Sequence, residues 1–222
     1  IHKGQEGPMG AVMEHSVGFE EALRKFEDSD FYKEMLDNQE ENVGYGIAAG
    51  MMSSGMGKHV PDSAAVTIER TKRDCDRVHV GLVDIGQGSE TVLAMIAADA
   101  LGVPVSSIEL CMADTDETED SGSTAASRTT YICGNAIVKA AKEILMTGSD
   151  SARAQCDFPE IPGENGVHSM FGYIVQGVKI KINPVTGAVD VLKAHNVTEA
   201  GHVLHPAMMA GQLFGGMAMS TG

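Results

Sequence analysis

The sequence predicts an α+β fold in which mixed sheets and hairpins pack against long helices. Short β-branched or alternating runs occur at 64–70 and 78–83, and longer runs of helical character occur at 89–102 and 132–146. The order of strands and helices is too irregular to require a doubly wound sheet. With 43% hydrophobic and 21% charged residues, the composition is that of an ordinary globular chain.

The first 42 residues are predicted to form a helical segment of their own. Ser16 precedes a run with acids first, bases later and apolar residues at helical spacing, so we expect it to cap a helix. A second helix is expected from Asp30. Small residues dominate from Val43, where a strand should run into a glycine loop. We therefore assign residues 43–222 to one α+β domain.

The later elements follow from local signals. The polar stretch TKRDCD between the strands at 64–70 and 78–83 suits a hairpin turn, and a second hairpin is expected at 173–182 and 188–193. Ser89 is placed to cap a helix that Gly102 ends. A strand at 107–113 precedes the second long helix.

Charge and composition exclude several classes of protein. The formal charge is −15 without a long basic cluster, so a nucleic-acid partner is not expected. No apolar run reaches the ~20 residues of a membrane span, and the N-terminus lacks the order of a signal peptide. We expect a cytoplasmic protein without membrane contact. The four cysteines form no CxxC pair, and Cys111 and Cys133 are expected to be buried free thiols.

The first motif with chemical potential is Gly86-Gln87-Gly88, which lies between a strand and a helix. Glycines permit close backbone approach, a helix start favours an anion, and an amide can both donate and accept. The alternative is a tight turn with a polar tip. Spacing favours that alternative, because the third glycine and the downstream acid of a dinucleotide fingerprint are missing.

The second motif is the small, hydroxyl-rich segment at 121–130, which also precedes a helix. Its hydroxyls and successive N–H groups could cradle a phosphate, and Arg128 would add a forked donor. Plain helix capping explains the same composition equally well.

Other patterns in the sequence give weaker indications of function. The acidic loop 114–120 fails the calcium template, since it lacks the required glycine and terminal glutamate, and is expected to be solvated. His195, His202 and His205 lack a convincing further ligand, so no metal site is predicted. The methionines are assigned to packing. No nucleophile elbow supports a hydrolase.

Taken in order, three stretches resemble the molybdenum hydroxylase large subunits, the family of xanthine dehydrogenase and aldehyde oxidase. They are VGLVDIGQGSETVLAMIAADALGVPVSSIEL, ADTDETEDSGSTAASRTTYICGNAIVKAA and HPAMMAGQLFGG, and the resemblance runs from about Gly44 to the C-terminus. It implies a molybdopterin-binding domain that holds molybdenum, with the cytosine dinucleotide form as one alternative. Iron-sulfur clusters and FAD would lie on other domains or subunits.

The resemblance also implies the site residues. The cofactor would contact three groups: Gly86, Gln87 and Gly88; Thr124, Ala125, Ala126, Ser127, Arg128 and Thr129; and Gln212 at a later helix start. The implied reaction is hydroxylation, with water as the oxygen source, of a heteroaromatic substrate (purine- or nicotinate-like) or an aldehyde.

Two family features have no counterpart in these residues: the upstream GGGFGGK-type segment and the downstream catalytic glutamate. We therefore assign no catalytic residue and expect a fragment of an oxidoreductase, with the remaining molybdenum-subunit segments and the iron-sulfur and flavin subunits as partners. The alternative is a non-catalytic assembly or binding subunit that keeps the fold.

Overall fold

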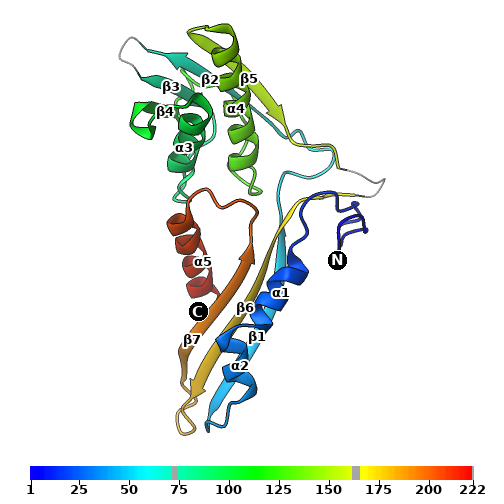
Figure 1. Cartoon of the computed structure of the whole chain (residues 1–222). Coiled ribbons are helices and arrows are strands. Elements are labelled where there is room, and N and C mark those ends of the chain that lie inside the picture. Colours follow the sequence, from blue (N-terminus) through cyan, green and yellow to red (C-terminus); the bar gives the residue numbers. More distant parts are fainter. Residues whose placement is uncertain (72–74, 162–165, 222) are drawn as a thin grey trace. The chain divides into compact units, whose positions relative to one another are not determined.

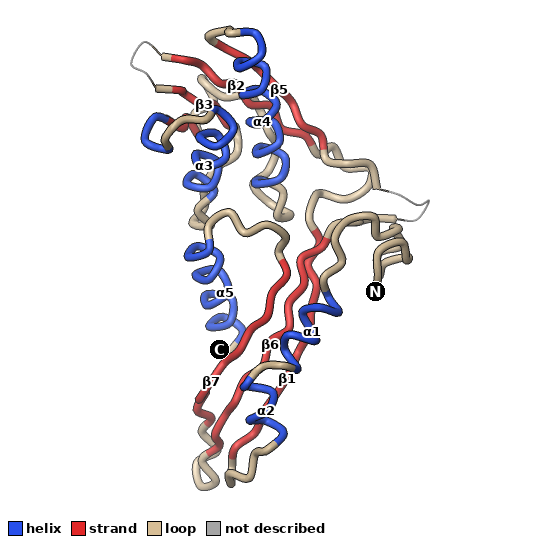
Figure 2. The backbone as a smooth tube through the Cα atoms, viewed as in Figure 1, coloured by secondary structure: helices blue, strands red, loops and turns tan. Residues whose placement is uncertain are grey.

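The structure, a computed structural model, describes residues 1–71, 75–161 and 166–221 (Figure 1). Helices and strands alternate irregularly along the chain (Figure 2), as the sequence predicts for an α+β protein. The elements are α1 (Phe19–Glu27), α2 (Asp30–Leu36), β1 (Val43–Ser53), β2 (Ser63–Arg70), β3 (Asp76–Val80), α3 (Ser89–Leu101), the short 3₁₀ helix η1 (Val105–Ser107), β4 (Ile108–Met112), α4 (Thr129–Thr147), β5 (Ser151–Asp157), β6 (Phe171–Ile182), β7 (Val189–Glu199) and α5 (Pro206–Ser220).

The chain divides into two compact units. Unit 1 comprises residues 1–53 and 162–222, and unit 2 comprises residues 54–161. This division differs from the predicted one at residue 42. The reason is that β1 pairs along its whole length with β6, which lies more than a hundred residues later in the chain. The helical segment 1–42 therefore belongs to the same unit as β6 and β7.

Unit 1 is an antiparallel sheet in the order β1-β6-β7, with α1 and α2 packed on it (Figure 1). Phe26 and Phe31 form its small core with Val175. Their rings lie directly on Gly177 of β6, where an added Cβ would come within 2.3 Å of Phe31 Cε1. A glycine is therefore required at this point of the strand.

The first helix begins later than the sequence analysis expects. The residue before α1 is Gly18, and Ser16 is not its cap. Gly18 is pressed against β7, where a Cβ would meet Glu199 Cγ at 2.4 Å. This close approach favours a glycine immediately before Phe19, where the helix starts. The second helix begins at Asp30 as expected, and Ser29 caps it.

Unit 2 is a four-stranded sheet in the order β4-β3-β2-β5, with α3 and α4 packed against one face. β2 and β3 pair as antiparallel neighbours, as predicted, and residues 72–74 of the expected turn lie outside the described residues. β5 is an edge strand that the sequence analysis missed. Its inward residues, Ala152, Ala154 and Cys156, are small and separated by polar ones, which weakens the apolar signal.

The two cysteines expected in apolar surroundings differ. Cys133 is fully buried between α4 and the sheet, and burial raises the pKa of its thiol to about 12. Cys111 is only half-buried and donates a hydrogen bond to Glu117. It lies on the face of the sheet away from the helices, since its register partner His79 alternates with the buried Val78 and Val80.

The acidic segment 113–121 crosses that second face, and most of residues 114–120 are exposed, as expected of a solvated loop, although side-chain contacts tie it to the sheet. Glu119 accepts two hydrogen bonds of 2.5 Å from Arg153 of β5, and Glu117 contacts Arg77 of β3. The backbone comes so close that a Cβ on Gly81 would lie 1.9 Å from the Glu119 carbonyl oxygen. The segment thus leads from β4 across the sheet to the hydroxyl-rich stretch.

None of the described helices is both long and apolar enough to cross a bilayer.

Candidate cofactor-binding site

The loop Gly86-Gln87-Gly88 connects the end of β3 to α3 and is organised by Asp84. The Asp84 carboxylate accepts hydrogen bonds from the backbone N–H groups of Gly86 (2.8 Å), Gly88 (3.2 Å) and Glu90 (3.0 Å). These bonds, the one from Glu90 above all, hold the pKa of Asp84 below its usual range. A carboxylate of the chain itself therefore occupies the positive start of α3, where the sequence analysis considered an external anion.

The Gln87 amide is turned into its own loop. Its oxygen accepts from the Ile85 N–H at 2.7 Å, and its nitrogen donates to Ser89 Oγ at 2.9 Å and to the Val83 carbonyl at 3.3 Å. Ser89 does not cap α3 as predicted, since it is the first residue of the helix and the preceding Gly88 has φ +80°. A ligand at this loop would therefore meet the polar amide of Gln87 and glycine backbone without side chains.

The two sequence motifs meet at Val83. Thr124 Oγ1 accepts from the Val83 N–H at 3.0 Å and donates to the Val83 carbonyl at 3.1 Å, and the same carbonyl accepts from Gln87. Residues 41 positions apart in the sequence thus meet just beyond the end of β3. The glycine loop and the segment 121–129 form one continuous part of unit 2.

Arg128 is the anchor of the segment 121–129. Its side chain is 2% exposed, and Nε lies 2.5 Å from Asp62 Oδ1. The other two nitrogens donate to the carbonyl oxygens of Ser121, Ser123 and Ser63 at 2.7–2.9 Å. Each guanidinium nitrogen is used inside the chain. This geometry favours a positioning role for Arg128 and does not fit the forked phosphate donor considered from the sequence.

The backbone after Thr124 is held in an uncommon conformation. Ala126 (φ +53°) and Ser127 (φ +52°) are consecutive non-glycine residues in the left-handed region, which costs each of them about 1–2 kcal/mol. Their carbonyl oxygens accept from the Gly55 N–H and from Ser54 Oγ, both at 2.8 Å. The segment is therefore clamped from both sides, by Arg128 and by residues 54–55.

The start of α4 lies at the end of this clamped segment. Ser127 and Thr130 are exposed there, whereas Thr129 is buried. Within the part of the chain that the structure describes, no side chain caps this helix. Its first N–H groups and the adjacent hydroxyls form a donor set that suits a polyanionic group.

Gln212 belongs to unit 1, whereas the other candidate residues belong to unit 2. The resemblance implies a place at a helix start for Gln212, but it lies within α5. Pro206 is the first residue of α5, and the His205 side chain caps the helix by accepting from the Met208 N–H. The Gln212 side chain is exposed. Its contact with the cofactor stays a prediction.

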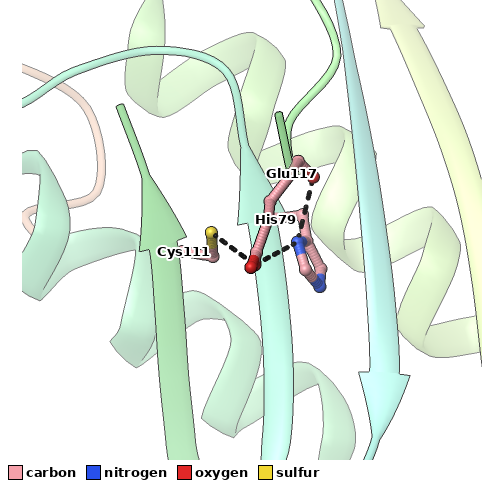
Figure 3. A group of neighbouring side chains, drawn as sticks. All are labelled: His79, Cys111 and Glu117. Atoms are coloured by element: carbon pink, nitrogen blue, oxygen red, sulfur yellow. Dashed lines mark hydrogen bonds and ion pairs between the residues drawn. The ribbon is translucent and has the colours of Figure 1, made fainter. Parts of the chain in front are cut away.

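Two of the three histidines considered as ligands have other roles, and the third, His202, is exposed. His195 stacks on Phe31 with ring centroids 5.7 Å apart, and His205 caps α5. A different group, His79, Cys111 and Glu117, brings three possible ligand atoms within 4.8 Å of one another on the second face of the unit 2 sheet (Figure 3). Cys111 and Glu117 are only six residues apart, but no local sequence pattern brings in His79, which is 38 residues from Glu117. The parallel pairing of β3 and β4 places His79 beside Cys111.

A hollow of about 390 Å³ lies near the buried ion pair and includes Asp62 in its wall. It is lined by residues 57–63 and 157–161, and none of the candidate cofactor residues is among them.

Comparison with known proteins covers both units. The model of the molybdopterin cofactor-binding domain family matches residues 21–160 and 146–222. The gamma subunit of the 6-hydroxypseudooxynicotine dehydrogenase complex of Paenarthrobacter nicotinovorans is 25% identical, over 100% of this chain and 33% of that protein. A xanthine dehydrogenase molybdenum-binding subunit of Escherichia coli is 24% identical, over 99% of this chain and 36% of that protein.

Solved structures show the same fold. The aldehyde oxidoreductase of Desulfovibrio gigas superimposes with a TM-score of 0.84 at 20% identity, over 99% of this chain and 27% of that one. The chain spans about a third of the length of the curated relatives named above. Since the family model matches all but the first 20 residues, the chain belongs to the molybdopterin cofactor-binding domain family.

Proposed function

We propose that this chain is the cofactor-binding part of a molybdenum-dependent hydroxylase or dehydrogenase. The observation that carries the proposal is the family match across both units. The relatives bear the names of a dehydrogenase subunit and a molybdenum-binding subunit. When bound, the molybdenum cofactor supplies the redox chemistry by which oxygen from water is added to a heteroaromatic or aldehyde substrate.

The segment 121–129 fits a polyanionic group. Its backbone is clamped, the hydroxyls of Ser127 and of the following Thr130 are exposed, and no described side chain caps the start of α4. We assign the phosphate contacts of a molybdopterin, or of its cytosine dinucleotide form, to this segment. Arg128 would act indirectly, because it fixes the positions of the carbonyls at Ser121 and Ser123.

The loop Gly86-Gln87-Gly88 is assigned a different contact. Asp84 already occupies the start of α3, so a phosphate there would meet a negative charge. The glycines allow close approach of a ligand, and the Gln87 amide can donate to or accept from an uncharged heteroatom of the pterin. To reach it, Gln87 would exchange the hydrogen bonds to Ser89 and Val83 for bonds to the ligand. Gln212 would contribute a second amide.

The proposal for a partner rests on helix α5 of unit 1. α5 is apolar, yet Phe214 is 71% and Met219 is 83% exposed. Such side chains on one helix favour contact with another polypeptide. We propose the remaining segments of a molybdenum subunit as that partner, with iron-sulfur and flavin subunits completing the electron path. The four free cysteines accord with a cytoplasmic location.

The test uses the complete enzyme that contains this chain. Ser127→Asp places a carboxylate at the start of α4, where it favours the helix but repels a bound phosphate. We expect molybdenum and pterin content to fall about tenfold, which corresponds to about 1.4 kcal/mol of binding free energy. The matched control is Ser149→Asp, which makes the same change just beyond the opposite end of α4.

Full cofactor content in Ser127→Asp would contradict the assignment of the phosphate contacts. A wild-type complex that assembles without molybdenum or pterin would favour the assembly subunit over the enzyme.

A further inference from the structure

The side chains of His79, Cys111 and Glu117 meet on the face of the unit 2 sheet away from α3 and α4 (Figure 3). Cys111 Sγ lies 3.3 Å from Glu117 Oε2, and His79 Nδ1 lies 3.9 Å from the same oxygen. Neighbouring ligands of a tetrahedral zinc ion are separated by about 3.5 Å. The cluster thus has the spacing of three ligands around one small cation.

The hydrogen bonds of His79 support this interpretation. Nδ1 lies 3.1 Å from the Glu117 carbonyl oxygen, which can only accept, so Nδ1 carries a proton. In the neutral ring, Nε2 is then a bare acceptor. It is buried, has no hydrogen-bond partner and lies 3.6 Å from the Glu69 carboxylate, which also only accepts. In this neutral form, the acceptor Nε2 therefore faces another acceptor and no donor.

A metal ion on Nδ1 would replace the hydrogen bond from Nδ1 to the Glu117 carbonyl oxygen, and it would remove this mismatch. The ring proton would move to Nε2, where it faces Glu69. Metal-bound histidines commonly donate their other N–H group to a carboxylate, which orients the ring. Binding would also replace the thiol proton of Cys111, which goes to solvent, without any change of oxidation state.

The local charge favours a cation. Glu69, Glu109 and Glu117 surround the cluster, and Arg77 is the positive group beside them. Arg77 Nη2 is held by Glu109 at 2.7 Å, and Nη1 reaches Glu117 Oε2 at 3.4 Å. A nitrogen, a sulfur and a carboxylate oxygen together suit zinc better than magnesium or calcium, which prefer oxygen ligands alone.

We propose that His79, Cys111 and Glu117 bind a divalent transition-metal ion of the zinc type, with water as the fourth ligand. The site joins β3, β4 and the acidic segment 113–121. This segment runs directly into the candidate cofactor segment 121–129, so the ion would fasten its upstream end to the sheet. The site is independent of molybdopterin, and its test requires none.

The experiment titrates the full chain, freed of metal with a chelator, with Co²⁺ as a spectroscopic probe and then with Zn²⁺. We expect one equivalent of Co²⁺ to give a thiolate-to-cobalt charge-transfer band, which Zn²⁺ abolishes and Mg²⁺ does not. Cys111→Ser should lose the band. Cys75→Ser, which alters another partly exposed thiol, should keep it.

Two further variants separate ligands from supporting residues. Glu117→Gln changes an exposed side chain, so the fold should persist while the affinity for Zn²⁺ falls at least about tenfold. Glu69→Gln should weaken binding less, because it acts through His79. Circular dichroism of each variant checks the fold. Absence of saturable binding, or a band that survives in Cys111→Ser, would overturn the proposal.

Discussion

The two helix starts of unit 2 allow the same prediction from the sequence but differ in their chemistry. Each follows a loop of glycines or hydroxylated residues that a sequence can equally assign to capping or to a phosphate. At α3 the chain supplies its own anion, since Asp84 accepts from Gly86, Gly88 and Glu90. At α4 the nearby charged residue is a buried cation, Arg128, which binds carbonyl oxygens behind the loop. The comparison shows that a helix start available to an anionic ligand differs from one that is not available in a single respect. At the available one, no carboxylate of the chain itself accepts from the first N–H groups.

The largest expected effect comes from the anchor of the α4 loop. Arg128→Lys keeps the charge but cannot bond Asp62 and three carbonyl oxygens at once, so buried groups lose their partners. We expect a loss on the order of 3 kcal/mol in the free energy of unfolding, in the absence of any cofactor. Urea denaturation followed by circular dichroism measures it.

The control for this variant is Arg153→Lys, which changes a guanidinium paired with Glu119 at the surface. It should shift the urea midpoint little, because exposed ion pairs contribute weakly. Equal midpoints for the Arg128 variant and the wild type would show that Arg128 is free for a ligand.

The next effect concerns the left-handed glycine of the α3 loop. Gly88→Ala adds a Cβ at φ +80° and should cost about 1–2 kcal/mol. Gly46→Ala is the control, since Gly46 lies in β1 and a Cβ there meets no atom within 4 Å. Thermal unfolding of the two variants checks the difference. A stable Gly88→Ala variant would mean that the loop rearranges easily.

A smaller and pH-dependent effect tests the internal anion. Asp84→Asn should cost about 1 kcal/mol at about pH 7, because the amide cannot satisfy the N–H groups as a carboxylate does. The pKa of Asp84 is lowered in the folded chain, so its contribution is present above the ordinary value of 3.8 and is lost as the pH falls below it. The difference between variant and wild type should therefore shrink towards about pH 3. A pH-independent difference would contradict this account.

The smallest effect has the opposite sign. Ser127→Gly relieves the left-handed backbone at the α4 loop and should stabilise the free chain by up to about 1 kcal/mol. The matched control is Ser106→Gly, since Ser106 is also exposed but is not left-handed. A destabilised Ser127→Gly variant would show that its hydroxyl, and not its backbone, holds the loop.

Much of the fold could be predicted because it depends on local patterns. The two hairpins, the two long helices and the left-handed Gly102 at the end of α3 follow from alternation, helical spacing and turn residues. Strand β5 could not be found in this way, since Ala152 and Ala154 bury little apolar surface. The division into units depends on the pairing of β1 with β6, which no local pattern specifies.

The sequence predicts which motifs form the candidate site, but it does not predict the role of each residue in them. The sequence locates Gln87 and Ser127, and the two loops that carry them meet at Val83. It could not show that Arg128 is buried, because its partner Asp62 is 66 residues away. Nor could it show that Asp84 fills the start of α3, since an acid before a glycine turn also suits a surface loop.

The central claim is that the start of α4, and not that of α3, receives the phosphate groups. The most direct measurement is a titration of the isotope-labelled chain with inorganic pyrophosphate, followed by the backbone amide shifts of unit 2. The account predicts shifts concentrated at residues 127–131, with little change at residues 86–90. Shifts centred on residues 86–90, or no saturable shift in either loop, would contradict it.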